Sequence, residues 1–219
     1  MLQDVIFNNR AEIMGTILGD FCFSHEVYGE SFYSFIVRVK RLSDMTDDIL
    51  VTASEKLDLC RFHDGDEVYI TGQYRSYNNY SNVGNKLILT VFAKEIAPAA
   101  EEHADRNTNF IYLNGFICKE PIFRTTPFGR EITDTLLAVN RTYSKSDYIP
   151  CIAWGRNARI TAGLPVGTNL IVFGRVQSRE YQKKLSETNI VNKIAYEVSV
   201  SKIEIGSASL PCDSTAELP

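Results

Sequence analysis

The most constraining feature of this sequence is an internal repeat with a period of about 100 residues. Shifting the chain by 100 residues gives ten identities across the 46 positions from 9 to 54, where ordinary composition gives roughly three by chance. After two small insertions in the second copy, the two copies can still be aligned near their ends. The matched pairs include Asn9 with Asn109, Gly15 with Gly115, Arg41 with Arg141, Asp47 with Asp147, Gly72 with Gly174, Ser76 with Ser178 and Glu95 with Glu204.

A period of this length is too long for a solenoid repeat and matches a small independent domain. The sequence therefore predicts two tandem copies of one fold. We place the first copy at residues 1–97, a polar linker with a proline at 98–108, the second copy at 109–205 and a flexible C-terminal tail at 206–219.

Each copy shows the alternation and the β-branched and aromatic content of short strands. In the second copy we expect five strands, at 110–118, 131–140, 148–154, 169–181 and 195–205. Between the third and fourth strands there is room for one short helix, at 156–163 and at its counterpart 55–62. This pattern predicts an all-β protein of two tandem OB-folds, which are five-stranded Greek-key barrels. A small β-sandwich would suit the strand count nearly as well.

Cysteine and histidine usage argues against a metal or cofactor. The five cysteines form no C-x-x-C pair, and the three histidines stand apart from other ligand-type residues. Dispersed, unpaired cysteines are typical of reduced thiols in a cytosolic protein. No basic segment followed by an apolar core opens the chain, and no apolar run approaches the ~20 residues of a membrane helix. We expect no cofactor, no metal and no membrane partner.

The second copy resembles the bacterial single-stranded DNA-binding protein family over residues 109–205. The order and spacing of several segments carry this resemblance, and the first copy inherits it through the repeat. The segments are Asn109–Gly115, Glu120–Gly129, Leu137–Arg141, Tyr148–Gly155, Gly167–Arg175 and Tyr196–Val200.

The resemblance implies binding of single-stranded DNA during replication, recombination or repair, in the cytoplasm and in association with the nucleoid. Such binding needs aromatic faces on which bases stack and cations that neutralise phosphates. The family's base-stacking positions fall on Tyr143, Tyr148, Trp154 and Tyr181. The candidate phosphate contacts are Arg130, Arg141, Lys145, Arg156, Arg175, Arg179, Lys183 and Lys184. A core position for Trp154, and a solvated hairpin tip for the lysine pair, are the alternatives.

The two copies differ in charge and in aromatic content. Residues 1–106 hold 10 Lys and Arg against 17 Asp and Glu, a net charge of −7, whereas residues 107–219 hold 13 against 10, a net charge of +3. Ser43, Asp48 and Ser54 stand where the second copy has Tyr143, Tyr148 and Trp154. Tyr74, Tyr77 and Tyr80 could form a separate aromatic strip or pack an edge. We hypothesise that the first copy is mainly a scaffold and dimerisation module.

The partners follow from the same resemblance. Four OB-folds are usual in an assembled member of the family, which implies a homodimer of this two-fold chain. Replication and repair proteins are possible partners, although the tail lacks the family's acidic tip ending in proline and phenylalanine. An accessory protein of the primosome or of recombination, acting mainly through protein contacts, is the alternative.

An enzyme reading has little support. Its best candidates are the acids Asp47, Asp48 and 64–67, which could hold a metal for phosphodiester cleavage. Because these acids are expected at turns and no histidine completes a site, we interpret them as solvated loop acids and expect no catalytic activity.

Overall fold

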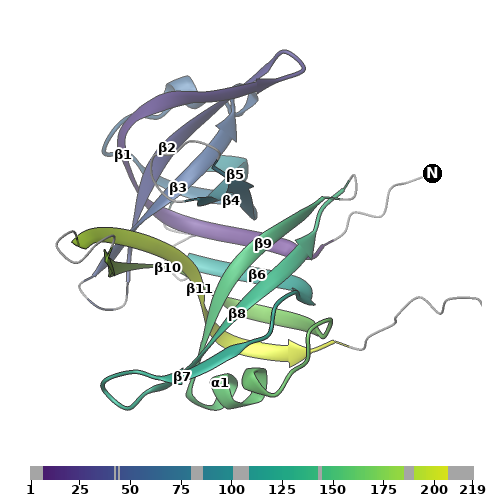
Figure 1. Ribbon diagram of the computed structural model, residues 1–219. Coiled ribbons are helices and arrows are strands. Elements are labelled where there is room, and N and C mark those ends of the chain that lie inside the picture. Colours follow the sequence, from purple (N-terminus) through teal and green to yellow (C-terminus); the bar gives the residue numbers. More distant parts are fainter. Residues whose placement is uncertain are drawn as a thin grey trace, which may run out of the picture.

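A computed structural model describes residues 7–41, 43, 45–79, 86–100, 109–142, 145–184 and 190–206, and in strands β10 and β11 the side chains of residues 180–184 and 190–193 are outside the description. Two barrels lie one above the other in Figure 1. The first barrel contains β1 (Asn9–Val27), β2 (Glu30–Lys40), β3 (Thr46–Ser54), β4 (Glu67–Asn78) and β5 (Leu87–Pro98). The second barrel contains β6 (Asn109–Ile117), β7 (Ile122–Thr125), β8 (Glu131–Asn140), β9 (Ser146–Trp154), β10 (Asn169–Lys184) and β11 (Ile190–Ile205).

Each set of strands closes on itself. In the first barrel β1 pairs with both β2 and β4, and β3 pairs with β5 in parallel. In the second barrel β6 pairs with both β8 and β10, and β9 pairs with β11 in parallel. Closure distinguishes a barrel from a sandwich, so the predicted pair of OB-folds is confirmed and the sandwich alternative is wrong.

The connection between the third and fourth barrel strands differs between the copies. In the second barrel it is the single helix α1 (Gly155–Ala162), whose Ala158 carbonyl accepts a hydrogen bond of 2.8 Å from the Thr133 hydroxyl. In the first barrel it is two successive 3-10 turns, Glu55–Leu57 and Leu59–Arg61. They are separated by Asp58 in the left-handed conformation, with φ 52°, which interrupts a continuous helix.

Glycines let strands bend and approach closely at the same place in both barrels. A bulge interrupts the β4–β5 ladder at Gly72 and the β10–β11 ladder at Gly174. A Cβ atom at these positions would lie 2.2 Å from the Phe92 carbonyl oxygen and 2.4 Å from that of Ser199. Only glycine fits such a contact, which explains this repeat identity.

One continuous sheet joins the barrels. Strand β1 pairs antiparallel with β6, from Asn9 opposite Leu113 to Ile13 opposite Asn109. All eleven strands therefore form a single hydrogen-bonded order, and β1 and β6 lie side by side between the two barrels in Figure 1. The pairing satisfies backbone groups that would be open edges on separate barrels.

A reciprocal side-chain contact reinforces this joint, and we call its two halves the clasps. In the first clasp, Arg41 donates two hydrogen bonds, of 2.7 and 2.6 Å, to the Asp47 carboxylate. The same carboxylate accepts bonds of 2.7 and 2.8 Å from the backbone N–H and hydroxyl of Ser178, across in the second barrel. Arg41 also donates to the Ser178 carbonyl.

The second clasp uses the matched residues in the opposite direction. Asp147 accepts a hydrogen bond of 2.7 Å from the backbone N–H of Ser76, in β4 of the first barrel. The Ser76 hydroxyl oxygen in turn accepts a bond of 2.7 Å from the backbone N–H of Tyr148. Arg141 Nε lies 3.2 Å from Asp147 Oδ2, and its guanidinium lies over the Tyr77 ring.

Candidate nucleic-acid interface

Strand β9 divides its side chains between the core and the outer surface. Asp147, Ile149, Cys151 and Ala153 are buried on one face. On the other face Tyr148 is 49% exposed, Pro150 and Trp154 are half-buried, and Ile152 is buried. Residues an even number apart share a strand face, so the Tyr148 and Trp154 side chains lie along the same outer face.

The residues beside these aromatics are mostly apolar, with one acid among them. On β8, Ala138 stands opposite Tyr148, Leu136 opposite Pro150, Asp134 opposite Ile152 and the buried Ile132 opposite Trp154. On the other side, Ser199 of β11 stands opposite Ile152. Cross-strand neighbours share a face, so the side chains between the two aromatic rings are mostly aliphatic. The exception is Asp134, which forms an ion pair of 2.6 Å with Arg124 of β7. We call this surface the outer strip.

Four of the predicted phosphate contacts are exposed cations around this barrel. Arg130 ends the turn before β8, Lys145 precedes β9, Arg156 lies in the first turn of α1 directly after Trp154, and Arg175 lies on β10. Within the described part of the chain, none of the four is in an ion pair. Arg175 contacts only the neutral Gln177 side chain, at 3.4 Å. They are available to an anionic ligand.

Two other predicted contacts are engaged with acids. Arg141 is in the second clasp, and its side chain is 21% exposed. Arg179 lies 3.5 Å from the Glu197 carboxylate, which is almost fully buried. Tyr143 and the side chains of Tyr181, Lys183 and Lys184 lie outside the described residues.

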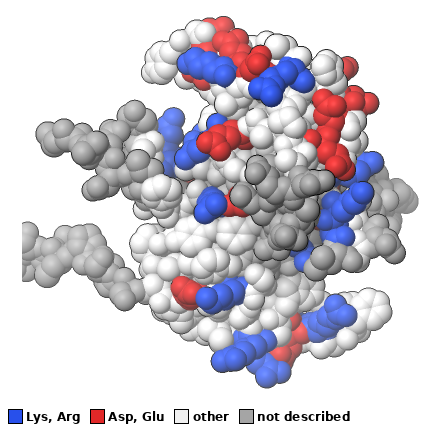
Figure 2. Space-filling view, turned by 180° about the vertical axis from the view of Figure 1, so that it is seen from behind, with Lys and Arg blue, Asp and Glu red and all other residues white. Residues whose placement is uncertain are grey.

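The first barrel carries ion pairs where the second carries aromatic rings. Asp48, the counterpart of Tyr148, accepts two hydrogen bonds of 2.7 Å from Arg38. Ser54, the counterpart of Trp154, donates to Glu30, which also pairs with Lys56. Figure 2 shows Asp and Glu gathered most densely over the upper half of the molecule, which is the first barrel. This surface is unsuited to a polyanion.

The predicted tyrosine strip of the first barrel does not form among the described residues. Tyr74 is in the core, with 1% exposure, and Tyr77 lies under Arg141 at 5.6 Å. Tyr80 lies outside the described residues. Sequence reasoning missed a different contact, in which the Arg75 guanidinium lies 3.7 Å from the centre of the Phe92 ring. Alternation along β4 and β5 was the only signal that could have placed both on one face.

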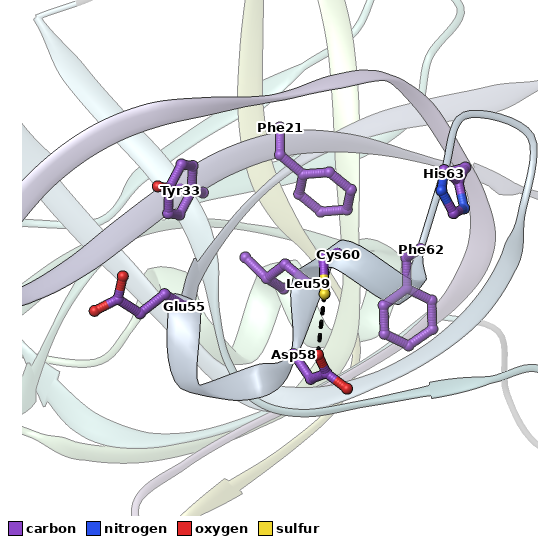
Figure 3. Close-up of a pocket in the computed structure, with 8 residues that line it drawn as sticks. All are labelled: Phe21, Tyr33, Glu55, Asp58, Leu59, Cys60, Phe62 and His63. Atoms are coloured by element: carbon purple, nitrogen blue, oxygen red, sulfur yellow. Dashed lines mark hydrogen bonds between the residues drawn. The ribbon is translucent and has the colours of Figure 1, made fainter.

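A pocket of about 370 Å³ opens beside the two 3-10 turns of the first barrel. Phe21, Tyr33 and Leu59 line it together with the acids Glu55 and Asp58, as Figure 3 shows. The dashed line in that figure joins the Cys60 thiol to the Asp58 carboxylate, 3.1 Å away. Its carboxylates make the pocket a poor site for phosphate.

The acids considered for metal chemistry have structural partners. Asp47 is fully buried in the first clasp, not solvated as expected, because the opposite barrel covers it. Asp64 accepts a hydrogen bond from the backbone of Gly19, and Asp66 accepts one from that of His63. The described residues contain no group of three potential metal ligands and no helix long and apolar enough to cross a membrane.

Comparison with known proteins relates this geometry to a family. Residues 108–205 match the sequence model of the Single-strand binding protein family. Single-stranded DNA-binding protein 3 of Clostridium acetobutylicum is 33% identical over 108 residues, which cover 46% of this chain and 74% of that protein. The Single-stranded DNA-binding protein of Clostridium tetani is 34% identical over 93 residues, covering 39% of this chain and 64% of that protein.

A solved structure matches across both barrels. The crystal structure of the wild-type single-stranded DNA binding protein from Thermus aquaticus superimposes with a TM-score of 0.68 at 16% identity, covering 92% of this chain and 94% of that one. At this identity the likeness establishes the fold.

Proposed function

This chain belongs to the single-strand binding protein family, and from that premise we propose that it binds single-stranded DNA along the outer strip of the second barrel. The matched segments span only 64% of the Clostridium tetani protein, so the proposal is argued from this chain's own residues. The observation that carries it is the position of Tyr148 and Trp154 on one outer face of β9.

Stacking supplies the affinity in this proposal. A base stacked on an aromatic ring contributes ~1–3 kcal/mol, and the contact tolerates any sequence because every base has a flat face. Tyr148 and Trp154 offer such rings on one face of β9. Tyr143 and Tyr181 complete the proposed set of platforms.

Cations supply the second part. Arg130, Lys145, Arg156 and Arg175 neutralise phosphates in this proposal. Lys183 and Lys184 of β10 are further candidates, as is Arg179, which also lies 3.5 Å from the Glu197 carboxylate. Binding then releases counterions, so affinity falls steeply as salt rises. Arg141 acts through the second clasp instead of on DNA.

The wider role of the chain is part of the same proposal. It protects single strands during replication, recombination or repair, without catalysis, in the cytoplasm. The second barrel is the main binding module, whereas the first is a scaffold that also joins two chains into a dimer of four OB-folds.

Tryptophan fluorescence tests the proposal directly because Trp154 is the only tryptophan. Titration with oligo-dT should quench the emission, and added salt should restore it. Duplex DNA of equal length is the control and should quench far less. Unchanged emission together with no binding at low salt would overturn the proposal.

A role based on protein contacts has one observation in its favour, the acidic and aromatic pocket of the first barrel. Such an accessory protein would bind oligo-dT only weakly until a protein partner is added. Tight binding by the isolated chain would therefore exclude this second candidate.

A further inference from the structure

We propose that Ser76, in the acidic first barrel, is a positioning residue for Tyr148 in the second barrel. The inference rests on the proposed function, because it treats Tyr148 as a platform for a base. It assigns the first barrel an indirect part in binding, through Tyr148, although that barrel lacks the aromatic positions of the second.

The contact consists of two short hydrogen bonds to consecutive residues of β9, together with a longer one of 3.5 Å from the Ser76 hydroxyl to Asp147 Oδ1. The Ser76 backbone N–H donates to Asp147 Oδ1 at 2.7 Å, and the Ser76 hydroxyl oxygen accepts from the backbone N–H of Tyr148 at 2.7 Å. Ser76 is 7% exposed and Asp147 is fully buried, so water competes little for the bond between these two residues. The start of β9 is thereby fixed from the opposite barrel.

The bond matters because this edge of β9 is otherwise open. In the described strands, β9 pairs with β11 only at Cys151 and Ile152, which lie beyond Tyr148 along the strand. A partly buried N–H that loses its acceptor is costly, so without Ser76 the strand would turn this group toward water. Such a turn would tilt the tyrosine ring out of line with Trp154.

The first clasp provides a natural control. Each serine donates its N–H and its hydroxyl to the aspartate of the opposite barrel, but the residue after Asp47 is the ion-paired Asp48 instead of an aromatic. Ser178 therefore holds a strand that presents no platform. The two serines are matched in the repeat, but only Ser76 contacts the backbone of a proposed base-stacking residue.

The test compares Ser76→Ala with Ser178→Ala in the full chain, using oligo-dT titration at one salt concentration. A misaligned platform gives up part of the ~1–3 kcal/mol that one stacked base contributes, which predicts about a fivefold loss of affinity for S76A and a change under about twofold for S178A. Ser76→Thr, which keeps the hydroxyl, should restore binding. Equal losses for the two alanine variants would overturn the inference while leaving the proposed function intact.

A double-mutant cycle separates positioning from a general loss of stability. In a Tyr148→Ala background, S76A should cause no further loss, because the ring that it aligns is already absent. An undiminished fivefold loss in that background would show that Ser76 acts elsewhere.

Hydrogen exchange tests the same contact without DNA. The Tyr148 amide should exchange faster in S76A, and the amides of Ile149 and Trp154 should change little. An unchanged Tyr148 amide would refute the contact itself. Failure of the wild-type chain to bind oligo-dT would instead remove the proposed function, and with it the role of Ser76 in binding.

Discussion

Asp47 and Asp147 occupy matched positions in the two clasps, yet the pKa of Asp47 is lowered and that of Asp147 is raised. Burial is the largest influence on both and favours the protonated form. At Asp47 it is outweighed by hydrogen bonds from Arg41 and Ser178. At Asp147, Arg141 Nε is within ion-pair distance, but neither it nor Asp147 Oδ2 has a hydrogen-bond partner among the described residues.

This difference predicts opposite pH behaviour for two isosteric variants. A lowered folded pKa gives stability that is present above the unfolded value of about 4 and is lost as pH falls through the folded pKa. Asp47→Asn should therefore cost about 3 kcal/mol of unfolding free energy at pH 7, and less at acid pH. Urea unfolding at several pH values measures this.

Asp147→Asn should behave differently. A raised folded pKa means that stability declines as pH rises from the unfolded to the folded value, because the buried charge is unfavourable. The asparagine removes that charge and keeps an acceptor for Ser76, so we expect a loss under about 1 kcal/mol at pH 7. Equal losses for the two variants would contradict this account.

If bases stack on the outer strip, removal of a single aromatic ring should weaken DNA binding strongly. Tyr148→Ala should weaken oligo-dT binding by roughly fivefold to 150-fold, the equivalent of one stacked base. Tyr28→Ala is the matched control, since Tyr28 is fully exposed at a turn of the first barrel. Fluorescence titration measures both, and a comparable loss for Tyr28→Ala would argue against the outer strip as the binding surface.

Helix α1 carries two arginines that can be compared in measurements of how DNA affinity depends on salt concentration. Arg156 is exposed and, in the described structure, outside any ion pair, whereas Arg159 Nε lies 2.6 Å from the Glu131 carboxylate. Arg156→Gln should reduce the slope of log affinity against log salt by about 0.7, the value for one phosphate contact on a single strand. Arg159→Gln should change it less. The reverse order would place the DNA elsewhere.

The four cysteines in the described part of the chain should react with iodoacetamide in a definite order. Cys22 and Cys60 are both exposed, but the hydrogen bond to Asp58 raises the pKa of the Cys60 thiol. Burial raises the pKa of the Cys151 thiol, and partial burial raises that of the Cys118 thiol. Because the thiolate is the nucleophile, Cys22 should react fastest and Cys151 slowest.

A single substitution tests whether Asp58 is the residue that raises the pKa of the Cys60 thiol. Asp58→Asn removes the carboxylate, and asparagine tolerates the left-handed conformation of that position. Alkylation of Cys60, followed by mass spectrometry, should accelerate in this variant. No acceleration would mean that Asp58 does not control the thiol.

Much of the fold was predictable because the strands alternate regularly. The expected strand at 131–140 agrees with β8 to the residue, and the one at 169–181 agrees with most of β10. Strand β7 was missed because all four of its residues, Ile122–Thr125, are exposed and show no alternation. The broken helix of the first barrel was missed because the conformation of Asp58 has no clear sequence signal.

The candidate site was predictable only in part, because some of its contacts join the two copies of the repeat. Even spacing on one strand was enough to place Tyr148 and Trp154 on a common face. The pairing of Arg141 with Asp147 was not predicted, although both had been recognised as repeat identities. Clasp partners such as Asp47 and Ser178 are 131 residues apart and belong to different copies, so alternation within one copy cannot reveal them.

The antiparallel joint between β1 and β6 has the form of a twofold contact, but both of its halves are encoded in one chain. In a symmetric pair of identical subunits, every substitution appears twice and both halves of the contact must tolerate it. Here each substitution appears once. The first barrel can therefore carry the carboxylate of Asp48 where the second barrel carries the ring of Tyr148. The joint between the barrels tolerates this difference.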